Sequence, residues 1–183
     1  YLANLTVETD ADVVCASRYV TYSEDCSVHF DKMYNSANVQ LHHEHLYLKK
    51  NRNFNDVYMI ENAPHGKLFK RNLLKDLKFP RKTTNTDALL FYYALFKSES
   101  VIYSMKPVAY YLVDRVGNSV TEVKPKVVDE LNKVYDLILE SSLEFIDLPD
   151  SFYFQMFMSY YYICDRCDII KKKKSLRLNK LKE

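Results

Sequence analysis

Glycine and tryptophan are scarce in this sequence, whose 183 residues include two glycines and no tryptophan. Loops that hold phosphate groups through backbone N–H groups depend on closely spaced glycines. Neither a GxGxxG pattern nor a Walker-type pattern occurs here. Any nucleotide bound by this chain would therefore have to be held in another way.

Cysteine and long apolar runs are also sparse. Four cysteines do not indicate a disulfide scaffold in a chain of this length, and we interpret them as reduced thiols in the cytoplasm. The longest apolar run, residues 152–164, is interrupted by Gln155 and is shorter than the roughly 20 residues that cross a bilayer. A net charge of +2 gives no general argument for nucleic acid, and we expect no nucleic-acid partner.

The composition that is present is typical of a globular protein, with 48% hydrophobic and 27% charged residues. Short apolar segments predict strands in the first two thirds of the chain. Apolar residues three or four positions apart predict helices between them and after Pro125. The sequence therefore predicts an α/β fold followed by a helical C-terminal region. The predicted strands cover residues 11–16, 18–22, 67–69, 101–104 and 108–113, and the predicted helices cover residues 1–9, 31–49, 88–96 and two segments after residue 125.

Asp87 is the first candidate for chemistry. It follows Thr84 and Asn85, which are suitable N-cap residues, and it precedes an apolar helix. A carboxylate at the edge of a cleft can act as a general base. The alternative is an aspartate that only stabilises the first turn of the helix, where free N–H groups favour a negative charge.

Two other patterns are weak as metal or redox sites. His42, His43 and His45 are close in sequence, but neighbouring residues on the predicted helix would not face one another. Cys164 and Cys167 form a single CxxC pair with no second pair, which is more typical of a buried or chance pair.

Three stretches occur in an informative order: APHGKLFKRNLLKDLKFP at residues 63–80, TNTD at 84–87 and VAYYLVDRVGNSVT at 108–121. Together they resemble the acceptor-side half of a family-2, GT-A-type bacterial glycosyltransferase. The resemblance implies a partial GT-A-like mixed sheet with flanking helices over residues 1–121 and a helical extension over 122–183. It also implies that the nucleotide-binding half precedes Tyr1.

The resemblance assigns roles to five residues. Asp87 would be the catalytic base, Arg115 and Ser119 would bind the donor diphosphate, and His65 and Lys67 would lie in the acceptor cleft. A guanidinium and a hydroxyl suit phosphate oxygens. Thr86 stands where the family usually has Glu, and His65 stands where it often has Trp.

The implied reaction is an inverting transfer of a sugar from a nucleotide-sugar, expected to be UDP-linked, to a surface polysaccharide or a lipid-linked glycan. A Mg²⁺ or Mn²⁺ ion would be held mainly by the preceding half, with no metal ligand from this chain. The residues 1–183 alone would then be inactive.

The alternative is a non-catalytic module that binds a protein or a membrane surface. An aromatic segment precedes Lys171, Lys172, Lys173 and Lys174, which could contact an anionic membrane at the inner face of the cell membrane. The same segment also fits a core helix with a basic end, so both interpretations stay open.

Overall fold

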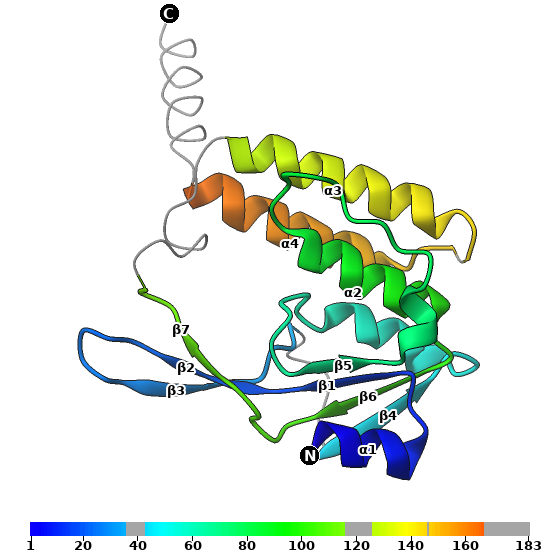
Figure 1. Ribbon diagram of the computed structural model, residues 1–183, viewed down its shortest axis with the longest axis horizontal. Coiled ribbons are helices and arrows are strands. Elements are labelled where there is room, and N and C mark those ends of the chain that lie inside the picture. Colours follow the sequence, from blue (N-terminus) through cyan, green and yellow to red (C-terminus); the bar gives the residue numbers. More distant parts are fainter. Residues whose placement is uncertain (36–42, 116–125, 146, 167–183) are drawn as a thin grey trace, which may run out of the picture.

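The computed structural model describes residues 1–35, 43–115, 126–145 and 147–166. It confirms an α/β fold with two mixed sheets and a helical C-terminal region. Figure 1 shows α2 (Thr86–Lys97), α3 (Lys126–Ser142) and α4 (Asp150–Arg166) on one side of the larger sheet, and α1 (Leu2–Thr9) on the other side.

The larger sheet has the strand order β4-β6-β1-β5. Its strands are β1 (Val13–Ala16), β4 (Glu44–Leu48), β5 (Lys67–Phe69) and β6 (Ser100–Ser104). β1 and β6 are parallel, whereas β4 and β5 run antiparallel to their neighbours. All four residues of β1 are buried, as expected for a short apolar strand in the centre of a sheet.

The smaller sheet contains the strands that follow β1 and β6 along the chain. Its order is β3-β2-β7, from β2 (Arg18–Thr21), β3 (Val28–Asp31) and β7 (Tyr110–Leu112). β2 follows β1 after the buried Ser17, whose N–H donates to the Ser104 carbonyl at 3.1 Å. Because β2 and β7 are also parallel, two stretches of chain run side by side through both sheets.

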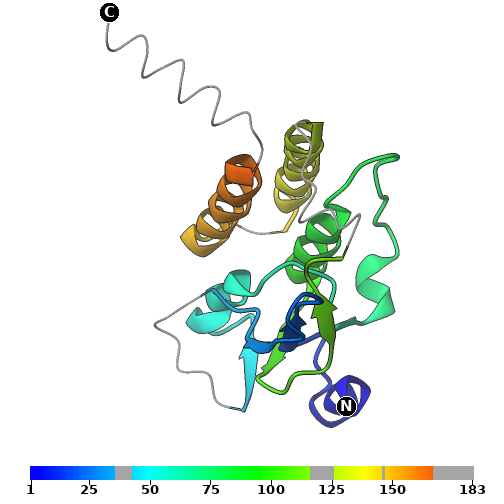
Figure 2. The same ribbon diagram turned by 90° about the vertical axis from the view of Figure 1, so that its left-hand side faces the viewer.

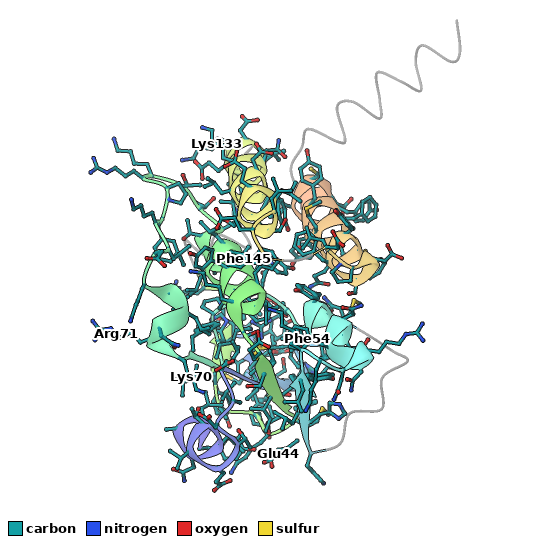
Figure 3. All side chains as sticks on the ribbon, turned by 90° about the vertical axis from the view of Figure 1, so that its right-hand side faces the viewer. Glu44, Phe54, Lys70, Arg71, Lys133 and Phe145 are labelled. Atoms are coloured by element: carbon teal, nitrogen blue, oxygen red, sulfur yellow. The ribbon has the colours of Figure 1, made fainter. Side chains whose placement is uncertain are left out.

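The main core lies between the larger sheet and the helices. α2 is buried on most sides, as predicted from its apolar sequence. Phe152 of α4 is 0% exposed and lies 5.0 Å from Tyr92 and 6.3 Å from Phe96 between ring centroids. Figure 3 shows Phe145 where α3 approaches α2, and its ring lies 6.3 Å from that of Tyr93.

The same core cluster contains residues from both predicted ranges, 1–121 and 122–183. The helical extension thus shares its buried surface with the α/β part. Figure 2 shows the helices gathered above the sheet and α1 below it. The boundary at residue 121 stays a prediction.

The helix predicted for residues 31–49 is wrong over the described part of that range. Residues 44–48 form β4, which pairs with β6 from Glu44 to Leu48, and Tyr34 forms an isolated bridge with Ile60. The apolar residues do recur at helical spacing, but Tyr47 is buried through strand pairing, which local spacing cannot reveal. Residues 36–42 lie outside the described part of the chain.

Two shorter elements also differ from the sequence prediction. β3 overlaps the helix expected over residues 31–49 only at Asp31, and its other residues lie outside any predicted element. Residues 52–59, for which no helix or strand was predicted, form a 3-10 helix, η1 (Arg52–Met59), in which Phe54, Val57 and Tyr58 are buried. A second 3-10 helix, η2 (Arg71–Leu74), follows β5.

Candidate functional site at the start of α2

Asp87 lies in the first turn of α2, as predicted. The residue before the helix, Asn85, adopts a left-handed conformation with φ of 58°, which asparagine tolerates better than most residues. Burial raises the pKa of the Asp87 carboxyl above its usual value. The N–H groups of Ala88 and Asp87 and the charge of Lys67 act in the opposite direction.

Lys67 begins β5 and places its ammonium group beside the start of α2. Its Nζ donates a hydrogen bond to the Ala63 carbonyl and lies 5.0 Å from the centre of the Phe91 ring. Burial lowers the pKa of Lys67, while the carboxylates of Glu61 and Asp87 favour its charged form. The structure therefore brings two predicted site residues, Lys67 and Asp87, within electrostatic reach of each other.

His65 lies in the same region and is held by Arg18. An Nη1–H group of Arg18 donates to His65 Nδ1 at 3.1 Å, so the proton of the neutral ring resides on Nε2. The rings of His65 and Tyr111 have their centres 4.6 Å apart. Burial lowers the pKa of His65, and the charges of Arg18 and Lys67 lower it further.

Gly66 determines the path of the chain between His65 and Lys67. Its φ is +62°, and its carbonyl accepts a hydrogen bond from Ala16 N–H at 2.8 Å. A Cβ at this position would lie 2.8 Å from the Ala16 carbonyl oxygen. Only glycine fits this close approach without a shift of the backbone.

Arg18 organises a charged network that the sequence prediction missed. Its side chain donates to Asp31 at 2.8 Å and to Glu61 at 3.2 Å, and its guanidinium carbon lies 4.9 Å from the Tyr111 ring centre. Arg18 is 7% exposed. An arginine within an apolar strand pattern was the available signal, since a buried guanidinium requires acidic partners. The partners themselves, 13 and 43 residues away, were not identifiable.

Arg115 is exposed and lies just after the end of β7. The preceding residue, Asp114, fixes this end of β7 to the turn after β2. Its carboxylate accepts hydrogen bonds from Ser23 N–H at 2.8 Å and from Ser23 Oγ at 2.7 Å. Ser119 lies outside the described residues, so the diphosphate site expected at Arg115 and Ser119 stays a prediction.

The histidine and cysteine patterns give no metal centre within the part of the chain that the structure describes. There, no group of three or more His, Cys, Asp or Glu side chains is arranged to hold an ion. His45 lies on β4 instead of the predicted helix, with its ring 4.4 Å from that of Tyr47. His42 and Cys167 lie outside the described residues.

The arrangement of side chains offers a carboxylate with a raised pKa, a neighbouring ammonium group and a neutral imidazole. These groups lie at the start of α2 and near the carboxyl end of β1, which is followed by Ser17 and β2. In open α/β sheets, ligands commonly bind outside the carboxyl ends of parallel strands. The chemistry available is proton acceptance by Asp87 and hydrogen bonding to a polar ligand.

Comparison with known proteins adds no assignment. No protein-family model matches this chain, and no curated protein matches it.

Proposed function

We propose that this chain is the acceptor-side part of a glycosyltransferase of the family-2, GT-A type. The observation that carries the proposal is the half-buried Asp87 at the start of α2, with its raised pKa and with Lys67 beside it. A general base works best when its pKa is close to the working pH, and burial moves the pKa of Asp87 in that direction.

In the proposed reaction, the Asp87 carboxylate accepts the proton of an acceptor hydroxyl. The hydroxyl oxygen forms a bond to the anomeric carbon of the donor sugar, and the bond from that carbon to the diphosphate oxygen breaks. Attack from the opposite side inverts the configuration. The leaving group is a nucleoside diphosphate, UDP in the expected case.

The other residues take supporting roles in this proposal. His65 and Lys67 contact the acceptor, with His65 oriented by Arg18. Arg115 and Ser119 bind the donor diphosphate and offset its growing charge. A Mg²⁺ or Mn²⁺ ion would be bound by a part of the protein other than this chain. The acceptor would be a surface polysaccharide or lipid-linked glycan at the inner face of the cell membrane.

The test is consumption of nucleotide-sugars by the protein encoded by the complete gene. We expect release of a nucleoside diphosphate from one donor of a panel, with Mg²⁺ or Mn²⁺ and acceptor glycans present. We expect no transfer by residues 1–183 alone. Transfer by these residues alone would contradict the assignment to an acceptor-side part.

A second candidate function is a non-catalytic interaction module. The specific observation that favours it is the exposed aromatic surface of α4. The absence of the acidic partner at Thr86 is also consistent with it. If the complete protein consumes no donor under any condition of the panel, this second function replaces the first.

A further inference from the structure

One face of α4 exposes six large apolar side chains to solvent. They are each 41–61% exposed, and we call this set the α4 face: Tyr153, Phe154, Phe157, Met158, Tyr161 and Tyr162. Adjacent pairs recur every four positions, so they form a single stripe along the helix. The rings of Phe157 and Tyr161 are stacked with their centres 6.2 Å apart.

The opposite side of α4 is already used by the core. Phe152 and Gln155 are buried against the rest of the protein. α4 is therefore apolar on its inner and outer sides, which is unusual for a helix that faces water. A contiguous exposed apolar surface of this kind marks an interaction site.

The residue types of the α4 face fit the boundary between lipid and water. Tyrosine has an apolar ring and a polar hydroxyl, and it is enriched at both membrane interfaces. Phe154, Phe157 and Met158 provide purely apolar groups between the three tyrosines. Among the described residues, no helix is both long and apolar enough to cross a bilayer. α4 would therefore lie on a membrane surface.

The charge of the residues that follow α4 in the sequence indicates which kind of lipid the protein would bind. Residues 167–183 contain seven Lys or Arg and two acidic residues, a net side-chain charge of +5. Each basic residue near an anionic surface strengthens binding to it. A basic segment complements anionic lipid, whereas it repels a second copy of itself.

We infer that α4 docks the protein onto an anionic lipid bilayer, with the α4 face against the membrane. This inference does not rest on the transferase proposal. It concerns a different helix and a different measurement, so either proposal can fail without the other.

The test is co-sedimentation of residues 1–183 with vesicles of phosphatidylcholine alone or with 30% phosphatidylglycerol. We expect the wild type to bind the anionic vesicles at least about tenfold more tightly than the neutral ones. The double variant Phe157→Ser/Tyr161→Ser should lose about tenfold or more of that affinity, because both rings then contribute no apolar contact. Replacement of Lys171, Lys172, Lys173 and Lys174 by Gln should remove the preference for anionic lipid.

The matched control is Val7→Ser. Val7 is 84% exposed but lies on α1, on the far side of the sheet from α4. The Val7→Ser variant should bind like the wild type, and thermal unfolding followed by circular dichroism should show that all variants fold.

Three results would overturn the inference: equal binding of the wild type to both kinds of vesicle, unchanged binding by the double variant, or an absence of vesicle binding. In the last case, a dimer in light scattering that the double variant dissociates would identify a second copy as the occupant.

Discussion

At Gly66, a left-handed φ of +62° coincides with a backbone approach that leaves no room for a Cβ. His65 and Lys67 are on either side of it, so the geometry of this residue sets where both side chains lie. Arg18 then fixes the ring of His65, and the start of α2 brings Asp87 toward Lys67. At the scale of the residue, the candidate site depends on one backbone conformation and a few long-range contacts.

Gly66→Ala should destabilise the protein by about 1–3 kcal/mol, because the added Cβ meets the Ala16 carbonyl and the left-handed conformation becomes strained. Urea denaturation measures the free energy of unfolding. Pro64→Ala is the matched control, since Pro64 is exposed two residues earlier. Equal stability of Gly66→Ala and wild type would show that this turn can rearrange without cost.

His65 predicts a pH dependence of stability. Burial lowers the folded-state pKa of His65 below the ordinary histidine value of 6.5, so the unfolded chain binds the proton more readily than the folded protein. Stability should therefore be full above pH 6.5 and should fall as the pH decreases toward the lowered pKa. Urea denaturation of the wild type and His65→Gln between pH 7.5 and 5.5 should show a smaller decrease in the variant. Parallel curves would mean that His65 titrates alike in both states.

At the scale of the element, the Arg18 network connects β2 to the end of β3 and to the segment that leads into β5. The two carboxylates keep part of their solvation, with Asp31 and Glu61 side chains 28% and 34% exposed. Arg18 itself is nearly inaccessible. The network therefore joins the end of β3, the segment at Glu61 and the His65 turn through a single buried cation.

Arg18→Met should cost about 2–3 kcal/mol of stability, because it leaves two carboxylates and a histidine without their shared donor. Arg18→Lys should cost less, since it keeps the charge but loses the forked geometry. Lys126→Met is the control, since it removes an exposed lysine that pairs with Glu130, and should cost under about 1 kcal/mol. If urea denaturation shows that Arg18→Met and Lys126→Met lose equal free energy of unfolding, the role given to Arg18 is contradicted.

Local sequence patterns predicted the elements whose burial depends on their own residues. One such element is β1, which was predicted from its apolar run. Another is α2, which was predicted from its N-cap residues, Asp87 and the apolar residues that follow. The helix expected over residues 31–49 was wrong because β4 is defined by its pairing with β6, which lies more than 50 residues away. The Arg18 network was missed for the same reason, since its carboxylates come from distant segments. The charge effect of Lys67 on Asp87 likewise required the tertiary arrangement.

At the scale of the whole molecule, the helical extension and the α/β part share one hydrophobic core. Phe152 joins them, because its ring lies near Tyr58, Tyr92 and Phe96, which come from η1 and α2. The outward side of the same helix carries the α4 face. α4 thus contributes to stability with one side and is proposed to bind a membrane with the other.

Phe152→Ala should destabilise the protein by about 3–5 kcal/mol, as expected for a fully buried aromatic ring replaced by a cavity. Phe157→Ala, on the same helix but 61% exposed, should change stability by no more than about 0.5 kcal/mol. Thermal unfolding followed by circular dichroism should show one cooperative transition for both. If Phe152→Ala instead melts α4 separately and leaves the main transition unchanged, the shared core does not unfold as a unit.

The role of Asp87 is tested most directly by nucleotide-sugar turnover of the complete protein, with wild type, Asp87→Asn and Asp76→Asn side by side. Asp87→Asn keeps the size of the side chain but cannot accept a proton, so nucleoside diphosphate release should drop at least about a hundredfold. Asp76 is an exposed aspartate paired with Lys97 before α2, and Asp76→Asn should retain wild-type activity. Wild-type turnover by a folded Asp87→Asn variant would contradict the assignment of Asp87 as the base.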